Sequence, residues 1–559
     1  MSLPSRYFKG RVSSSACISD FLSRQVILIA LLLGTIGLCR PGYAGGTQRV
    51  GVLLNTTNAS PGYTLFSAIS YANTYLIDNE GQLVHRWTAD HVPGNSQYLR
   101  DNGNLVRTAD PGSANFLVGG DAGLVEEYDW EGSKLWEFLY SDTTHRAHHD
   151  IAVLPNGNVL IIAWELKTSA EAIAAGRDPG LLVKGELWPD HVIEIQPDDT
   201  NTPTIVWEWH AWDHLIQDFD VSKTNFGVVG DHPELIDLNY VQQNGRADWL
   251  HINAIDYNDS LDQVLLCVPR FNELWIIDHS TTTAEAAGHS GGNSGRGGDL
   301  LYRWGNPRTY GAGTTTNQQF FFQHDTHWIP TGLPGEGNIL IFNNGIGRSE
   351  SIFSTVEELV TPVDTNGNYA LVPGTSFGPA VPTWNFTATP PGDLFSGGIS
   401  GADRQPNGNT LICEGFTGEF FEVTATSNLV WHYVNPVVGT GPINQGQLPL
   451  GNAVFRANRY TFDFPGFAGR NLTPKGPVEL DPNAVFILAE VTRTSTGMRI
   501  SWVSTPDSTY HIRHTPSLAP PIWDPIATNL AVGTLTTFSD TNPGRIGQSG
   551  GVYSVVEVQ

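Results

Sequence analysis

A short strand-like unit that recurs six times constrains this chain more than any other feature of its sequence. Each copy has an apolar residue first (Thr in the fifth copy), an aromatic residue or His second, and an aromatic residue fourth. The copies lie at 84–87, 135–138, 206–209, 301–304, 383–386 and 430–433, at intervals of 47 to 95 residues. Repeats of this length are typical of β-propellers, in which each blade has four strands. The sequence therefore predicts an all-β fold, a six-bladed β-propeller.

Turns and apolar runs between the copies supply the other strands of each predicted blade. Asn-Gly-Asn turns lie at 102–104, 156–158 and 407–409, ahead of apolar runs, and such turns are typical of hairpins. The longest intervals hold insertions at 211–247 and 280–299. The second insertion includes a glycine-rich tract at 291–298, which lacks the strand-to-helix setting of a phosphate-binding loop. A strand at 49–54 is expected to complete the last blade by pairing near 452–455.

The two ends of the chain differ from the repeats. Basic residues precede an apolar run at 26–38, and Gly42-Tyr43-Ala44 offers a small-residue cleavage site. Residues 1–44 are therefore expected to be a signal peptide, and the protein to be exported to the periplasm or secreted. The propeller is expected at 48–470 and a linker at 471–481. Alternating residues within 482–559 predict a small C-terminal β-sandwich, similar to fibronectin type III domains.

Charge and cysteine content exclude several classes of protein. The chain has 30 Lys and Arg against 56 Asp and Glu, a formal net charge of −26. Nucleic acids and anionic membranes are bound by clustered basic residues, so we expect no nucleic-acid partner, and no membrane partner after signal removal. Beyond residue 44 the cysteines are Cys267 and Cys413, too few for a disulfide scaffold. One bridge and two buried thiols both fit this count, and the composition favours no particular oligomeric state.

Histidines occupy one equivalent position in three successive repeats. Aligning the repeats on their strand turns brings together Asn95, His149, His251, His324 and Ser400. Equivalent positions at the start of the innermost strands surround the central channel of a propeller, so these imidazoles are expected to converge. Imidazole acts as a nucleophile, an acid or a base near neutral pH. Arg348, just past a strand of the fourth repeat, is expected to bring a guanidinium group to the same channel.

Two other interpretations of the histidines stay open. Such histidines also serve as structural hydrogen-bonding groups, which would suit a non-catalytic propeller that binds a ligand or a glycan. Three neutral imidazoles are also suitable ligands for a transition metal, as in a metal-dependent hydrolase or lyase. The repeated aromatic units and the Asn-Gly turns are interpreted as scaffold.

Four motifs resemble the arylsulfate sulfotransferase family, whose members move sulfate between phenols without a nucleotide donor. They are Asp-Trp-x-His-x-Asn at 248–253, Gln-His-Asp at 323–325, Asn-Asn-Gly followed by Arg at 343–348, and Phe-Arg-Ala-Asn-Arg-Tyr at 455–460. The resemblance spans about 60 to 470. It implies a six-bladed propeller in a periplasmic or secreted protein, and transfer through a sulfohistidine. It also implies a small aromatic sulfate donor and a phenolic acceptor, with neither a cofactor nor a metal.

One departure from the family bears on the chemistry. The resemblance assigns His251, His324 and Arg348 to positions that hold the sulfate, but the family's nucleophilic histidine lies in a later blade. The equivalent stretch of this chain is Gly-Ile-Ser-Gly-Ala-Asp-Arg at 398–404, without a histidine. Either His324 or His149 then takes the place of the nucleophile, or the chain binds a ligand without transferring sulfate. The candidate catalytic residues are His324, His251, His149 and Arg348, and the candidate substrate-binding residues are His327, Asn253, Ser400 and Arg456.

Overall fold

The computed structural model describes residues 48–197, 202–240, 246–349, 351–480, 488–494, 496–516, 524–546 and 552–558. The predicted signal peptide at 1–44 lies outside these ranges. The chain divides into two compact units, Met1–Leu480 and Asp481–Gln559. Strands dominate both units, which confirms the predicted all-β class. Within the described ranges, no helix has the length and apolar character needed to cross a membrane.

The described residues of the first unit form six sheets of four or five strands, and the strands of each sheet follow one another from the innermost outward. The first three are β5 (Val92–Leu99), β6 (Leu105–Asp110), β7 (Leu124–Tyr128) and β8 (Lys134–Leu139); β9 (His145–Val153), β10 (Val159–Glu165), β13 (Asp190–Gln196) and β14 (Thr204–His210); and β17 (Ala254–Asn258), β18 (Gln263–Val268), β19 (Glu273–Asp278) and β20 (Tyr302–Trp304). The other three are β21 (His324–Trp328), β22 (Ile339–Asn343), β23 (Thr355–Leu359) and β24 (Trp384–Phe386); β25 (Gly401–Arg404), β26 (Thr410–Glu414), β27 (Glu419–Val423), β28 (Leu429–Val434) and β1 (Gly51–Asn55); and β31 (Val454–Tyr460), β2 (Tyr63–Ala68), β3 (Thr74–Ile77) and β4 (Leu83–Trp87).

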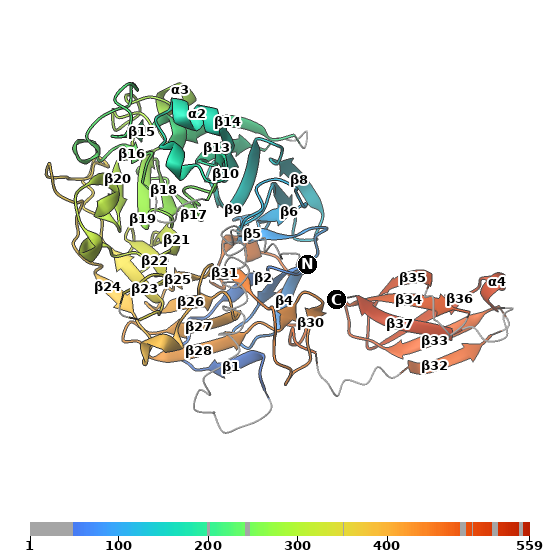
Figure 1. Ribbon diagram of the computed structural model, residues 1–559. Helices are drawn as coiled ribbons and strands as arrows, with labels where there is room; N and C mark the ends of the chain where they lie inside the picture. The colour runs from blue at the N-terminus through green and yellow to red at the C-terminus, as the bar shows by residue number, and fades with distance from the viewer. Residues whose placement is uncertain are drawn as a thin grey trace, which may run out of the picture. The chain divides into compact units, whose positions relative to one another are not determined.

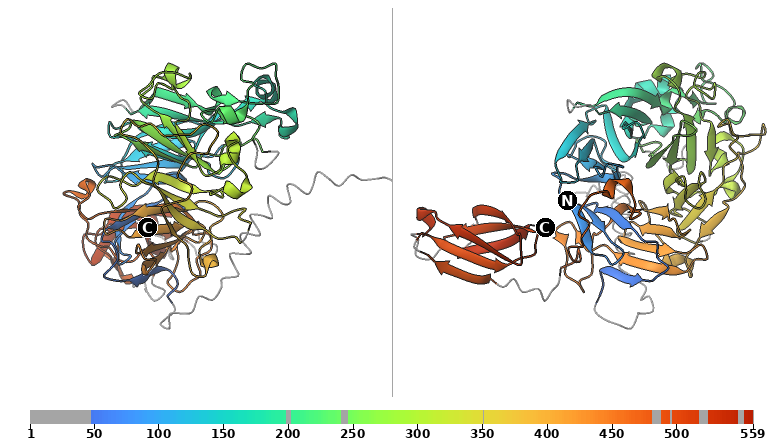
Figure 2. Two further views of the ribbon diagram at one scale, coloured as in Figure 1. Left: turned by 90° about the vertical axis from the view of Figure 1, so that its left-hand side faces the viewer. Right: turned by 180° about the vertical axis from the view of Figure 1, so that it is seen from behind.

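These sheets are arranged around a common centre, which β5, β9, β17, β21, β25 and β31 face (Figure 1). Each of these strands contacts the innermost strand of the next sheet, and β31 contacts both β25 and β5. The series of sheets therefore closes on itself. The view from behind shows the same order around the centre (Figure 2).

The six copies of the repeated unit lie in the outermost strand of each four-stranded repeat: β4, β8, β14, β20, β24 and β28. Their aromatic side chains join neighbouring sheets at the periphery. The indole of Trp87 donates a hydrogen bond to the carbonyl of Asp129 in the next sheet (3.0 Å), and that of Trp431 donates to the carbonyl of Asn79 (2.8 Å). The repeat is thus part of the scaffold, as the sequence indicated.

The prediction for the N-terminal strand was wrong about its partner. The sixth sheet is completed by β2, which pairs with β31 and leads into the hairpins of β3 and β4. These three strands extend the sheet outward from β31, so the outward edge of β31 is already paired with β2 and is not open to the segment at 49–54. Strand β1 instead pairs with β28 and becomes the fifth strand of the neighbouring sheet.

Short elements form the insertions between the sheets. Those between β10 and β20 lie together on one side of the ring of sheets, where α2, α3, β15 and β16 are labelled (Figure 1). They are β11 (Lys167–Thr168), α2 (Ser169–Ala174), η1 (Pro179–Leu181), β12 (Glu186–Leu187), η2 (Ala211–Asp213), β15 (Leu215–Ile216), η3 (Val229–Asp231), β16 (Ile236–Asp237) and α3 (Thr283–Ala286). Later in the chain come η4 (Pro307–Tyr310), η5 (Thr315–Asn317), η6 (Pro391–Asp393), β29 (Val437–Val438), β30 (Gly441–Pro442) and η7 (Pro465–Phe467).

Apolar clusters fill the spaces between adjacent sheets, where burial removes large side chains from water. One cluster joins Leu160 of the second sheet to Leu266 of the third. Another includes Val478, so the part of the predicted linker before residue 481 packs against the first unit. Cys267 and Cys413 are free, buried thiols.

The described residues of the second unit form two three-stranded sheets. One contains β32 (Leu488–Arg493), β33 (Met498–Val503) and β36 (Leu535–Asp540), and the other contains β35 (Asp524–Leu530), β34 (Thr509–Thr515) and β37 (Val552–Val558). A short helix, α4 (Pro543–Ile546), lies between β36 and β37 in the chain. The core of this unit includes Ile500, Trp502, Tyr510 and Ile512.

Candidate active site

Left-handed backbone marks four of the five positions that the repeat alignment made equivalent. They are Asn95 (φ 122°), His149 (50°), His251 (58°) and Ser400 (86°). Such angles are uncommon outside glycine because Cβ crowds the backbone, and they gather at functional sites. His324 is the exception, since the positive φ angles of its repeat belong to Phe322 (63°) and Asp325 (52°).

Two adjacent histidines meet in the middle of β9. Neighbouring side chains of a strand normally point to opposite faces. In β9 the left-handed His149 and a register shift against β10 bring both imidazoles together, with their Nδ1 atoms 2.8 Å apart. On the far side of His148, Nε2 lies 2.8 Å from Oδ1 of the fully buried Asp190. We call Asp190, His148 and His149 the imidazole relay.

Burial sets the protonation of the relay. It lowers the pKa of His148 well below its ordinary value, and it does the same to His149, with a further contribution from nearby His251. Burial and then the negative charge of Asp248 raise the pKa of Asp190 well above its ordinary value. Although Nε2 of His148 lies close to Oδ1 of Asp190, the contact lacks hydrogen-bond geometry, and this buried Nε2 atom has no hydrogen-bond partner among the described residues. The contact between the two Nδ1 atoms requires a proton on one of them. When His148 supplies that proton, the neutral ring of His149 carries its own proton on Nε2.

His251 has a different anchor. Its Nδ1–H donates to Oδ2 of Asp248 over 2.7 Å, and Arg270 and the Trp164 indole also donate to that carboxylate, over 3.1 and 3.2 Å. Although burial opposes ionisation, the charges and hydrogen bonds of His251 and Arg270 hold the pKa of Asp248 well below its usual range. An ionised Asp248 accepts the Nδ1 proton of His251 and leaves the lone pair on Nε2.

The rings of His149 and His251 meet edge to face, with centroids 4.6 Å apart. Each ring is anchored through Nδ1, and neither Nε2 atom has a hydrogen-bond partner in the part of the chain that the structure describes. Phe455 lies 6.1 Å from His149, and Phe322 lies 6.1 Å from His251, nearly parallel to it. The lack of a side chain at Gly120 leaves room for the His149 ring, because a Cβ there would lie 1.9 Å from its Cε1 atom.

His324 is near this pair, but both of its ring nitrogens are used by the protein. The amide of Asn344 donates to the carbonyls of Ser396 and Ile399, which directs its Oδ1 atom toward Nδ1 of His324 at 2.7 Å. Nε2 accepts a hydrogen bond from the Ile399 backbone N–H (3.1 Å). Burial lowers the pKa of His324 to about 3, so this imidazole is neutral.

Arg456 lies between two buried carboxylates. Its Nη1 atom is 2.8 Å from Asp150 and its Nε atom is 2.8 Å from Asp325, and the guanidinium lies over the ring of Phe455. Within the described ranges, its buried Nη2 atom has no hydrogen-bond partner. The positive charge of Arg456 contributes to the low pKa values of His149 and His324, which places it beside the histidines.

The other candidates have different surroundings. Nδ1 of His327 lies 3.6 Å from Oδ1 of Asp325. Although burial opposes protonation of the ring, the negative charge of Asp325 raises the pKa of His327 to about 9. Arg348 donates to Thr355 (3.0 Å) and lies over Phe321 and Phe353; none of its described contacts is with a histidine of the site.

Asn253 and Ser400 are fully buried and have structural partners. The amide of Asn253 donates to the carbonyl of Gln323 (2.9 Å), and the hydroxyl of Ser400 accepts from the backbone N–H of Gly415 (2.9 Å). Both side chains thus hold loops around the site in place.

Sequence reasoning missed several residues of this site. Asp190 is on the third strand of its sheet and Arg270 is in a turn, so neither shares the repeat position of the histidines. His148 is next to His149 in the sequence but does not occupy the repeat position that singled out His149. Phe322 and Phe455 had no periodic signal of their own.

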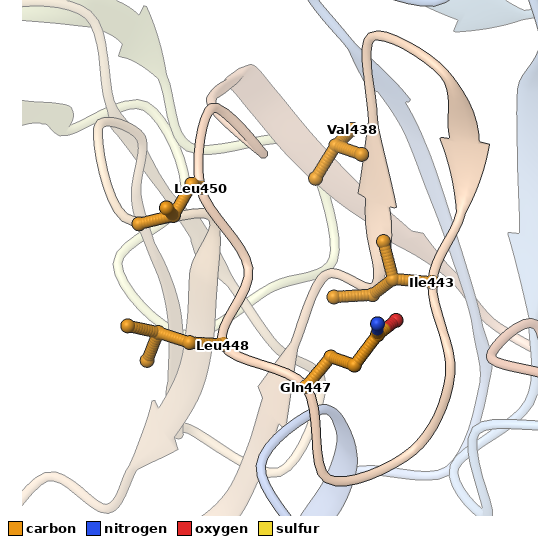
Figure 3. Close-up of a pocket in the computed structure, with 5 residues that line it drawn as sticks. All are labelled: Val438, Ile443, Gln447, Leu448 and Leu450. Atoms are coloured by element: carbon orange, nitrogen blue, oxygen red, sulfur yellow. The ribbon is translucent and has the colours of Figure 1, made fainter. Parts of the chain in front are cut away.

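Two other features lie apart from the histidines. An apolar hollow of about 340 Å³ is lined by Val438, Ile443, Gln447, Leu448 and Leu450 (Figure 3). None of these side chains titrates, so the hollow has no acid–base chemistry. Among the described residues, the group whose geometry suits a metal ion is His214, His289 and Asp299, which includes no histidine of the site.

Comparison with known proteins agrees with the sequence motifs. The family model described as Arylsulfotransferase (ASST) matches residues 52–437, more than half of the chain. The chain belongs to the arylsulfotransferase family. The matched range contains His149, His251 and His324 and ends before Arg456.

Several solved structures are similar to this chain, and no curated protein matches it. A protein of unknown function from Bacteroides caccae is 10% identical, with 72% of this chain and 99% of that chain covered and a TM-score of 0.37. Apo AztD from Citrobacter koseri is 8% identical, with 72% and 98% covered and a TM-score of 0.32. The Dos1 propeller is 10% identical, with 69% and 75% covered and a TM-score of 0.28.

Proposed function

We propose that this chain is an aryl sulfotransferase that moves a sulfuryl group from a phenolic sulfate ester to a phenol, through a covalent intermediate on His251. Membership of the arylsulfotransferase family supports the reaction class. The observation that carries the assignment is the meeting of His149 and His251, each anchored through Nδ1 and each with Nε2 free of described protein partners.

His251 is the nucleophile in this proposal. Its Nε2 lone pair attacks sulfur, the N–S bond forms, and the bond from sulfur to the aryl oxygen breaks. As the imidazole ring becomes positive, the ionised Asp248 at Nδ1 stabilises that charge, an arrangement that resembles the aspartate–histidine pairs of covalent catalysis. His324 is less suited to this role because Nε2 already accepts the Ile399 N–H.

The imidazole relay is the acid. A phenolate leaves poorly unless it is protonated, and an acid in place contributes typically about 10²–10⁴-fold. His149 gives its Nε2 proton to the phenol oxygen and takes a proton at Nδ1 from His148, which takes one at Nε2 from Asp190. The relay ends with an ionised Asp190 and no proton left over. The reverse movement accepts the proton of the incoming phenol when it attacks the sulfohistidine.

The remaining side chains suit an aromatic sulfate. The free Nη2 of Arg456 is a donor for a sulfuryl oxygen, and the rings of Phe455 and Phe322 flank the two histidines at a distance suited to aromatic contact. These roles require no redox cofactor and no nucleotide.

The architecture and location follow the same proposal. We infer a six-bladed β-propeller from the closed series of six sheets, and a sandwich of the fibronectin type III kind from the two sheets of the second unit. The basic and apolar segment at 1–44 supports export, with sulfate transfer taking place in the periplasm or outside the cell.

Trapping the intermediate tests this function. The protein is mixed with p-nitrophenyl sulfate, quenched and digested, and the peptide that contains His251 is expected to gain about 80 Da, the mass of SO3. The label should disappear in His251→Asn and persist in His232→Asn, a matched change at an exposed histidine. Saturable binding without a label or nitrophenol release, with any phenol as acceptor, would instead identify a non-catalytic binding propeller.

A further inference from the structure

A second histidine cluster lies at the edge of the first unit, where its two insertions meet. His214 follows η2, His289 follows α3, and Asp299 ends the glycine-rich tract. The insertions lie beside β14 at the outer end of the ring (Figure 1). No residue of the proposed sulfotransferase site takes part.

Both histidines point the same nitrogen at one carboxylate oxygen. Nδ1 of His214 and Nδ1 of His289 each lie 2.8 Å from Oδ1 of Asp299. His214 is fully buried and Asp299 nearly so, whereas His289 is exposed to solvent. One carboxylate and two imidazoles, supplied by three separate segments, therefore converge on one point.

The hydrogen bonds of His214 leave Nδ1 as the atom that can bind an ion. Nε2 of His214 lies 2.8 Å from the carbonyl of Ala286, which only accepts, so Nε2 is the donor of that hydrogen bond. Nδ1 faces the carboxylate of Asp299, and without a proton it offers a lone pair to a metal ion between the two groups.

The surroundings of His214 fix its orientation, as in metal sites where the ligating histidine donates its other N–H to a carbonyl. Gly298 has no side chain, and a Cβ there would lie 2.6 Å from Nε2 of His214. The Trp209 ring is parallel to the imidazole at 5.7 Å, and its indole donates to the Gly298 carbonyl (2.7 Å). The ligand is thus held from three sides before any ion binds.

We propose that His214, His289 and Asp299 bind a divalent transition metal of the zinc type, which joins the two insertions. Two imidazoles, one carboxylate and a water molecule form the tetrahedral set that Zn²⁺ favours. Bonds of about 2.0–2.1 Å place tetrahedral donors about 3.3 Å apart, so each of the two histidine–Asp299 contacts, now 2.8 Å long, opens by about half an ångström when the ion enters. The exposed side of His289 leaves a path for the ion.

Titration of the chelator-treated, full-length protein with ZnCl2 tests this site. Calorimetry is expected to show one Zn²⁺ per chain, with Mg²⁺ and Ca²⁺ not competing because they prefer oxygen ligands. His289→Ala should weaken Zn²⁺ binding by more than about 100-fold. The matched control, His232→Ala, changes an exposed histidine outside the cluster and should bind as the unaltered protein does.

A second measurement does not depend on calorimetry. Arg296 is an exposed trypsin site within the glycine-rich tract, and Zn²⁺ should slow cleavage there in the unaltered protein but not in His289→Ala. Zinc binding that survives His289→Ala, or the absence of both binding and protection, would overturn the proposal. Neither result bears on sulfate transfer, because the two sites share no residue.

Discussion

Nδ1 of His148 lies 2.8 Å from Nδ1 of His149, so the two imidazoles share one proton between them. In the proposed mechanism, Asp190, whose Oδ1 lies 2.8 Å from Nε2 of His148, decides which nitrogen holds that proton. When Asp190 is protonated, His149 carries its own proton on Nε2 and acts as an acid. The neighbouring His251 has an ionised Asp248 at Nδ1 and a lone pair on Nε2. Two carboxylates with opposite pKa shifts thus give two adjacent imidazoles opposite roles.

The loss of kcat/KM that follows removal of the relay's proton should depend on the leaving group of the sulfate donor. Asp190→Asn keeps the shape of the side chain but cannot supply a proton. We expect kcat/KM for phenyl sulfate, which has a poor leaving group, to fall by about 10²–10⁴-fold, and that for p-nitrophenyl sulfate to fall much less. Initial rates across a series of substituted phenyl sulfates measure this.

A folding defect would lower kcat/KM for every donor by the same factor. The slope of log kcat/KM against the pKa of the leaving phenol therefore distinguishes the loss of an acid from a folding defect. Near-ultraviolet circular dichroism of Asp190→Asn provides the structural control. Equal losses for phenyl and p-nitrophenyl sulfate would contradict the relay.

Substitution of His324 should affect stability more than the covalent step. His324→Leu leaves the Asn344 Oδ1 atom and the Ile399 N–H without a partner, and each buried group left unsatisfied costs about 1–3 kcal/mol. The urea midpoint of the first unit is expected to fall, while the peptide that contains His251 still gains the sulfuryl label. A folded His324→Leu protein that forms no label would show that His324 itself carries the sulfuryl group.

The sequence predicted the scaffold well because the scaffold is periodic. The repeated aromatic unit identified the outermost strand of every four-stranded repeat, and Asn-Gly-Asn turns fell between the first and second strands. The N-terminal strand was misassigned because pairing between distant edges leaves no periodic signal. Strand β1 is apolar enough for either sheet, and only the prior occupation of β31 by β2 decides between them.

Part of the site was predictable because its histidines also recur periodically, at one position of the repeat. His149 and His251 were found through their shared repeat position, and they do meet. The anchors that distinguish them come from elsewhere, since Asp190 lies on a third strand and Asp248 acts through a side chain three residues before His251. The role of His324 could not be read from its position, which matched the others, because its hydrogen bonds differ from theirs.

Arg456 should prove essential to folding as well as to binding. Arg456→Met removes the cation beside the buried Asp150 and one of the two cations beside Asp325, and breaking a buried ion pair in this way costs about 3–5 kcal/mol. The double variant Arg456→Met with Asp150→Asn removes one uncompensated charge and should recover part of that loss. Thermal unfolding of the single and double variants measures it, and a single variant as stable as the unaltered protein would contradict the ion-pair assignment.

His279 should make stability fall at alkaline pH. Its Nδ1 atom lies 2.7 Å from Oδ1 of Asp262, and its Nε2 atom lies 3.1 Å from Oε2 of Glu194. His279 thereby joins the third sheet to Glu194 of the second sheet. Although burial opposes protonation, these two carboxylates raise the pKa of His279 to about 9, above the ordinary value of 6.5. The protonated ring is favoured in the folded state, so its contribution is complete below about pH 6.5 and is lost as the pH rises through about 9. The melting temperature of the unaltered protein should therefore exceed that of His279→Gln at about pH 6, and the difference should shrink by about pH 9.5. A difference that stays constant over this range would mean that His279 stabilises the fold as a neutral ring.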